Sequence, residues 1–192
     1  MVPVPPGDYL VIDTETTGRY KVGCSPPRLV EVAWLLCDAT GEVIERGDRT
    51  VRPDGFTIPA SASRIHGITT GYALRAGVPI REALDALTRA ADKSPLIVAH
   101  NLRFDRAVIA GECRRVGVPD PLAALPGICT MESTASFCKL RRGSGYKWPT
   151  LSELHQTLFG LPCEGAHRAA GDVEACARCF FALKEMGFWK KV

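Results

Sequence analysis

One stretch decides both the fold and the chemistry of this sequence: Tyr9-Leu-Val-Ile-Asp-Thr-Glu-Thr-Thr-Gly18. Its first half is short, apolar and β-branched, which is typical of a buried strand, and its second half favours a loop. Successive side chains of a strand point to opposite faces, so Asp13 and Glu15, two residues apart, share a face. We predict a strand over residues 9–13 with two carboxylates side by side at its end.

The following segments predict an antiparallel hairpin and then an alternation of helices and strands. Apolar runs at 29–37 and 43–51 flank a short connection that contains Gly41, which favours a hairpin. Apolar residues recur at helical spacing over 79–91 and 104–116, and 166–187 reads as a loop followed by a long helix. The continuous apolar run 96–100 predicts a strand buried on both faces. This order indicates an α/β domain with a mixed sheet.

The composition fits one globular domain. The chain has 192 residues, of which 46% are hydrophobic and 23% charged, so we expect a single domain over 1–192 with a core of about 8–187. Apolar runs fall short of the roughly 18 residues that cross a bilayer, and the N-terminus lacks a secretory leader pattern. We therefore expect a cytoplasmic protein without a membrane partner. A net charge of +3 is too small to identify a nucleic-acid partner by itself.

The eight cysteines are expected to be reduced and buried. Cys37 ends an apolar run, and most of the others lie in segments of helical character. Cys176 and Cys179 have CxxC spacing, but a zinc site needs a second pair of ligands, and a redox pair opens a helix rather than lying inside one. We therefore expect neither a metal site nor a redox site at this pair.

Four acids are candidates for a metal site. Like charges at Asp13 and Glu15 raise their own pKa or bind a cation, and oxygen ligands suit Mg²⁺ or Mn²⁺ better than zinc. A turn that uses these residues for local hydrogen bonds is the alternative. Asp105 falls in the first turn of the helix after run 96–100, and Asp172 opens the last helix, where helix capping also favours Asp.

His167 precedes Asp172 by five residues, within the small-residue segment 164–171. Helix capping does not explain this histidine, and small neighbours can bring its imidazole close to whatever Asp172 holds. A lone histidine is more often structural, but an unperturbed imidazole titrates near pH 6.5, which makes His167 a candidate general base.

Three motifs together resemble a known family. Val11-Ile-Asp-Thr-Glu-Thr-Thr-Gly18, His100-Asn-Leu-Arg-Phe-Asp105 and His167-Arg-Ala-Ala-Gly-Asp172, in this order, closely resemble the exonuclease motifs of the DnaQ-like DEDDh superfamily. The resemblance spans residues 9 to about 185 and is greatest to the small free-standing exonucleases of the superfamily. It implies a ribonuclease H-like fold, with a five-stranded mixed sheet and helices on both faces.

The resemblance also implies a function, namely a 3′–5′ exonuclease that releases nucleoside 5′-monophosphates from the 3′ end of DNA. Two Mg²⁺ or Mn²⁺ ions would be held by the four acids, and His167 would deprotonate the attacking water. The acids are Asp13, Glu15, Asp105 and Asp172. The terminal nucleotide would be contacted by Thr16, Thr17, Gly18, Ile65 and His66. The structural alternatives are that Gly18 turns the chain and that Ile65 packs in the core.

Other interpretations of the substrate and partners stay open. Single-stranded DNA is the favoured substrate, and an exoribonuclease acting on RNA or a proofreading subunit with a polymerase partner are the alternatives. A binding module without catalysis is disfavoured by the complete set of four acids and His167. Between Glu132 and Glu153 the sequence has no acid, and its cations alternate with aromatics, which suits a single strand or, equally, a solvated loop. These residues are Lys139, Arg141, Arg142, Tyr146, Lys147 and Trp148.

Overall fold

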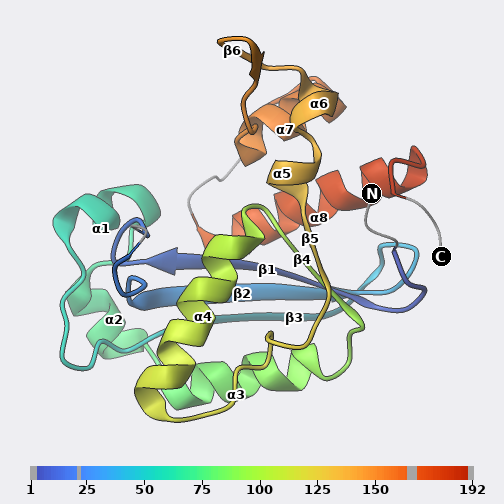
Figure 1. Ribbon diagram of the computed structural model, residues 1–192. Coiled ribbons are helices and arrows are strands. Elements are labelled where there is room, and N and C mark those ends of the chain that lie inside the picture. The colour runs from blue at the N-terminus through green and yellow to red at the C-terminus, as the bar shows by residue number, and fades with distance from the viewer. Residues whose placement is uncertain (1–3, 21–22, 164–167, 190–192) are drawn as a thin grey trace.

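A five-stranded sheet forms the centre of the protein (Figure 1). The structure is a computed structural model that describes residues 4–20, 23–163 and 168–189. The strand order is β3-β2-β1-β4-β5. The strands are β1 (Tyr9–Thr16), β2 (Leu29–Cys37), β3 (Val43–Thr50), β4 (Leu96–Ala99) and β5 (Gly127–Cys129). Because β1 pairs antiparallel with β2 and parallel with β4, the predicted mixed sheet and the hairpin of β2 and β3 are confirmed.

Strand β1 is longer than the sequence pattern predicts. The predicted end at Asp13 is wrong, because the backbone keeps pairing with β2 through Glu15 opposite Glu31 and Thr16 opposite Leu29. Strand β4 is short and pairs only with Tyr9, Leu10 and Val11. One edge of β1 is therefore not covered by β4 beyond Val11, and this is the part of β1 that carries the two acids.

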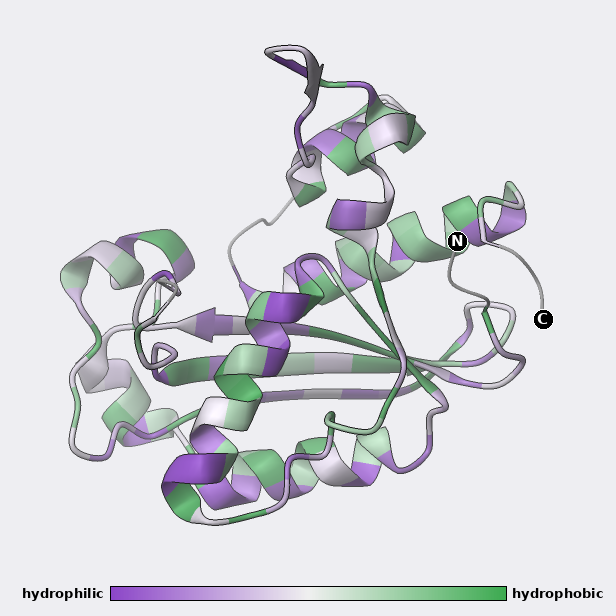
Figure 2. Ribbon diagram, in the orientation of Figure 1, coloured by the Kyte–Doolittle hydropathy of each residue, from purple (hydrophilic) through white to green (hydrophobic). Residues whose placement is uncertain are grey.

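Helices cover both faces of the sheet, as predicted (Figure 1). Helices α3 (Ile80–Ala91) and α4 (Leu102–Val116) pack on the face that contains Leu10 and Ile12. Helices α7 (Leu151–Phe159) and α8 (Ala169–Glu185) pack on the face that contains Tyr9 and Val11. Figure 2 shows largely hydrophobic β4 and β5, whereas hydrophilic residues gather at the ends of α4 and in the loops. Burial of apolar surface in these two layers holds β1 in place.

Several short elements escape the sequence pattern. They are α1 (Ala60–His66), α2 (Thr70–Ala76), α5 (Thr130–Ser133), α6 (Ala135–Cys138), β6 (Arg141–Arg142) and β7 (Gly145–Tyr146). The pattern does not predict β5 or α7 either. Helices α1 and α2 pack against the start of β2, and together they bury a small apolar cluster. This cluster includes Val30 of β2 and Ile68 of the connection between the two helices. Most of these elements are too short to show a periodic pattern in the sequence.

The cysteines are free thiols, and the prediction that they are buried holds for four of them, Cys37, Cys113, Cys176 and Cys179. It is wrong for Cys24, which is exposed, and Cys129, Cys138 and Cys163 are half-buried. Cys176 and Cys179 are buried inside α8. Within the part of the chain that the structure describes, none of the helices has the length and apolar character to pass through a membrane.

Candidate active site

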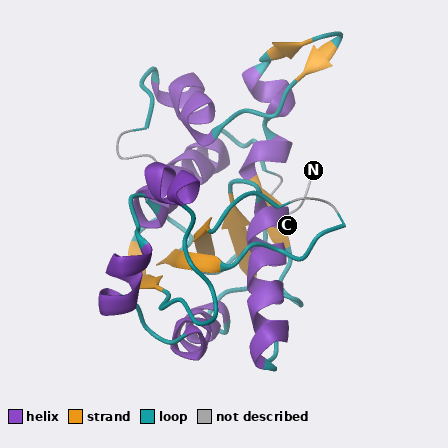
Figure 3. Ribbon diagram, turned by 90° about the vertical axis from the view of Figure 1, so that its left-hand side faces the viewer, coloured by secondary structure: helices purple, strands orange, loops and turns teal. Residues whose placement is uncertain are grey.

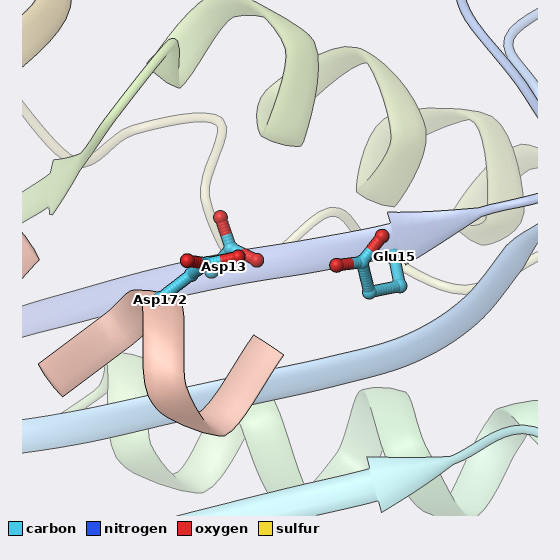
Figure 4. A group of neighbouring side chains, drawn as sticks. All are labelled: Asp13, Glu15 and Asp172. Carbon is cyan, nitrogen blue, oxygen red and sulfur yellow. The ribbon is translucent and has the colours of Figure 1, made fainter. Parts of the chain in front are cut away.

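Three carboxylates meet on the α8 side of β1 (Figure 4). Asp13 and Glu15 point from β1 toward this face, and Asp172 projects from the first turn of α8. One carboxylate oxygen from each residue lies within 4.8 Å of the other two. All three side chains are partly buried, and the strand period that the sequence predicts for Asp13 and Glu15 accounts for their shared direction.

Asp105 reaches the same region from the opposite face. The chain turns sharply from β4 into α4 at Asn101, which has a left-handed φ of 83° that asparagine tolerates better than most residues. Asp105 then falls in the first turn of α4, where it is buried. The hydroxyl of Thr14, on the α4 side of β1, donates a 2.8 Å hydrogen bond to Asp105 Oδ1. The structure thus places Asp105 beside the three-carboxylate cluster and brings Asp13, Glu15 and Asp172 into it.

Burial and mutual repulsion raise the pKa values of these acids. Burial raises the pKa of Asp13 well above its usual range, and the charges of Asp105, Asp172, Glu15 and Glu31 raise it further. Burial, followed by the charges of Asp172 and Glu31, raises the pKa of Glu15 to about 7. The pKa of Asp105 is also raised to about 7, mainly by burial, although the Thr14 hydrogen bond opposes this shift.

This donor set fits a hard divalent cation. All three ligand candidates offer carboxylate oxygen, which Mg²⁺ and Mn²⁺ prefer, and a cation among them would offset the repulsion between their charges. The turn alternative for Asp13 and Glu15 does not hold, since both lie within β1.

Glu31 is a fifth acid at this site, and the sequence analysis missed it. It is buried on β2, directly opposite Glu15 in the strand pair. Its two oxygens accept hydrogen bonds from Arg168 Nη2 at 2.7 Å and Nε at 3.2 Å, and the backbone N–H of Ala169 donates to it at 3.2 Å. Glu31 therefore anchors the first residue of α8, the helix that carries Asp172. Its signal in the sequence is a charged residue within the apolar run 29–37.

The predicted base, His167, lies outside the described residues. Its neighbour Arg168 is the first described residue of this segment and is the one paired with Glu31. The anchor of α8 therefore acts on the residue that directly follows His167.

The predicted nucleotide-contacting residues have mixed surroundings. The Thr16 hydroxyl donates to the Gly18 carbonyl at 2.6 Å, and the Thr17 hydroxyl accepts from the Arg28 N–H at 3.0 Å, so both shape the loop after β1. Gly18 is exposed, with open space where a side chain would be. Ile65 is 54% exposed, so the alternative that it packs in the core is wrong.

His66, unlike its exposed neighbour Ile65, is a buried residue. Its Nδ1 accepts a 3.1 Å hydrogen bond from the Ile68 N–H, and burial lowers its pKa. A neutral imidazole in this place holds the connection between α1 and α2.

Two arginines that flank Asp105 make structural contacts. Arg103 forms a 2.9 Å ion pair with Glu132, and Arg106 donates to the carbonyls of Leu122 and Leu125 at 2.9 and 2.5 Å.

Comparison with known protein families identifies the family of this chain. A family model described as "Exonuclease" (RNase_T) matches residues 10–180. No curated protein sequence is similar enough to the chain to count as a match.

Solved structures of Escherichia coli exonuclease I share the fold. The complex with a dT13 oligonucleotide has a TM-score of 0.76 at 23% identity, over 94% of this chain and 42% of that one. The dA16 complex has a TM-score of 0.76 at 22% identity, over 93% and 41%. The zinc-bound form of the single-stranded DNA complex has a TM-score of 0.74 at 24% identity, over 94% and 41%. The chain thus spans about two fifths of these proteins, and the predicted ribonuclease H-like fold is confirmed.

We expect Arg168→Met to weaken the anchor of α8. The substitution leaves Glu31 buried without its charged partner, so the free energy of unfolding should fall by roughly 1–3 kcal/mol in urea titrations. Arg46→Met is the matched control, because the ion pair of Arg46 with Glu174 is exposed on both sides, and we expect a change of about 0.5 kcal/mol or less. Equal effects of the two substitutions would contradict the anchoring role.

Metal-free protein should lose stability as pH rises. The folded-state pKa values of Glu15 and Asp105, about 7, lie above their unfolded values, so their protonation stabilises the fold at low pH and this contribution disappears as pH rises through 7. We expect the melting temperature in EDTA to be lower at pH 8 than at pH 5.5. Burial and the neighbouring charges also raise the pKa of Asp13, so Asp13→Asn removes one of the titrating groups and should reduce this difference. A pH dependence identical in the two proteins would argue against the repulsion.

Proposed function

Because the chain belongs to the exonuclease family of the DnaQ-like superfamily, we propose that it is a 3′–5′ exonuclease that removes nucleoside 5′-monophosphates from single-stranded DNA. One observation carries the proposal, namely the convergence of Asp13, Glu15 and Asp172 within 4.8 Å, with Asp105 beside them. Repulsion among four neighbouring acids destabilises the fold, and binding of the metal ions that phosphodiester hydrolysis needs accounts for their presence.

The acids are the proposed ligands of two Mg²⁺ or Mn²⁺ ions. Asp13, Glu15 and Asp172 would supply oxygens from the α8 side, and Asp105 would supply its carboxylate from the α4 side. When bound, such ions lower the pKa of water and stabilise the charge that develops on the attacking and leaving oxygens at phosphorus. Thr14 orients Asp105 through its hydrogen bond to Oδ1.

His167 is the proposed general base. A neutral imidazole at this position would accept the proton of the attacking water, and Arg168, held by Glu31, would fix the chain directly after it. The loop at 16–18 and the exposed Ile65 lie at the end of β1 and on α1, where they would contact the terminal nucleotide.

The preference for DNA rests on similarity. The structures of E. coli exonuclease I that share this fold hold dT13 and dA16 oligonucleotides, which supports single-stranded DNA as the substrate of this chain. RNA is the alternative, because discrimination depends on contacts to the 2′-hydroxyl.

Digestion of end-labelled oligonucleotides tests the proposal. With Mg²⁺, 5′-labelled single-stranded DNA should shorten as a ladder, whereas 3′-labelled DNA should release labelled mononucleotide at once. EDTA should abolish both, and added Mn²⁺ should restore them.

Asp13→Asn should lower the rate by orders of magnitude, because it removes a ligand charge and keeps the shape of the side chain. Asp92→Asn, at the exposed end of α3, is the control and should keep the wild-type rate. A ladder from the 3′-labelled DNA, with immediate release of labelled mononucleotide from the 5′-labelled DNA, would overturn the stated polarity. Faster digestion of a matched RNA would overturn the stated substrate.

His167→Ala should separate base catalysis from metal binding. We expect turnover to fall by roughly 10²–10⁴-fold, while stabilisation of the fold by Mn²⁺ changes little. The wild-type rate should rise with pH as the imidazole loses its proton, and the variant should lack this rise. A variant that keeps both the rate and the pH profile would assign His167 a structural role.

A further inference from the structure

A small arm projects from the body of the protein (Figures 1 and 3). It comprises residues 139–148 and is built on the antiparallel pair β6 and β7, in which Arg141 lies opposite Tyr146. A further backbone hydrogen bond, from the Lys147 N–H to the Leu140 carbonyl at 2.9 Å, closes its base. Most of its side chains are exposed, so the core does not explain their identity.

The side chains of the arm are basic and aromatic. It carries four cations, and residues 133–152 contain no acid. Tyr146 and Trp148 are 45% and 54% exposed, which is unusual for large aromatic rings. The Arg141 guanidinium lies 5.8 Å from the centre of the Tyr146 ring, and Lys147 pairs with Glu153 at 2.5 Å. Among the described residues, Arg142 makes no ion pair, so its charge is available to a ligand.

A pocket of about 640 Å³ separates the arm from the start of α4. Its lining includes Arg142, Tyr146 and Trp148 from the arm, and His100, Asn101 and Met131 from the body of the protein. This volume is in the range of small-molecule binding sites. Asn101 caps the start of α4, and Asp105 lies in the first turn of that helix, so the pocket lining and Asp105 are about one helical turn apart along the chain.

The His100 ring ties the two sides of this pocket together. Its Nε2 lies 3.1 Å from the Pro149 carbonyl, directly after the arm, and its Nδ1 lies 3.0 Å from the Thr130 hydroxyl. A carbonyl only accepts, so Nε2 donates. The arm is therefore held at a set position relative to the turn that leads to Asp105.

We propose that this pocket binds single-stranded DNA on the 5′ side of the bond that is cut. A base would stack on Trp148 and Tyr146, and a backbone phosphate would pair with Arg142. This inference rests on the proposed function, because the 3′ end must lie at the carboxylates for the preceding nucleotides to reach the arm. Exposed rings favour an unpaired strand, since a duplex hides its base faces, and the cations match the charge of its phosphates.

Fluorescence anisotropy with labelled (dT)12 in EDTA measures binding without hydrolysis. We expect Arg142→Gln combined with Trp148→Ala to weaken binding by about tenfold or more. Arg142→Gln alone should make the slope of log K against log[salt] shallower by about 0.7, because one phosphate contact is lost. Trp148→Phe keeps a stacking face and should bind nearly as the wild type. Arg114→Gln removes an exposed charge about 18 Å further along α4 and should change binding less than twofold.

A mononucleotide substrate separates the arm from the carboxylates. Thymidine 5′-(p-nitrophenyl phosphate) presents one nucleotide, so the double variant should hydrolyse it within twofold of the wild type while its KM for (dT)12 rises. Unchanged (dT)12 binding, an equal loss of binding to a blunt duplex, or a parallel loss of ester hydrolysis would overturn the role of the arm. If the wild type hydrolyses neither substrate, the exonuclease proposal fails, and the anisotropy titrations still decide whether the arm binds the strand.

Discussion

Repulsion among the acids around β1 is the constraint on which the rest of this structure depends. Asp13, Glu15 and Asp172 lie within 4.8 Å of one another, and Asp105 and Glu31 add their charges from neighbouring elements. The fold tolerates this because β1 is the middle strand of the sheet and apolar layers clamp it from both sides. Burial, followed by the charges of the neighbouring acids, raises the pKa values of Asp13 and Glu15.

The scaffold balances the charge in different ways on the two faces of the sheet. On the α8 face, Arg168 pairs with Glu31 and anchors the helix that carries Asp172, and the positive charge of Arg168 offsets part of the rise in the pKa of Glu15. On the α4 face, the Thr14 hydroxyl offsets part of the shift of Asp105. Asp13, Glu15 and Asp172 are left close together on the α8 side, where a cation would complete the balance.

The short β4 sets the position of both Asp105 and the pocket under the arm. Because the pairing of β4 with β1 ends at Val11, the chain turns into α4 beside the part of β1 that β4 does not cover, and the same turn contributes His100 and Asn101 to the pocket under the arm. One turn therefore positions Asp105 for the proposed chemistry and sets the position of the arm. In this arrangement, the cut bond and the preceding nucleotides would lie on two sides of the start of α4.

The sequence by itself determined what depends on local backbone geometry. The two-residue spacing of Asp13 and Glu15 puts them on one face of a strand, and the patterns around Asp105 and Asp172 place each in the first turn of a helix, because strand and helix periods are properties of the backbone. Only the tertiary structure decided which of these acids share an oxygen cluster and which lies beside it. Only the tertiary structure showed that Glu31 anchors Arg168, 137 residues away, and that Thr14 orients Asp105, 91 residues away. Such pairs are set by the packing of whole elements and the length of β4, which no local periodicity contains.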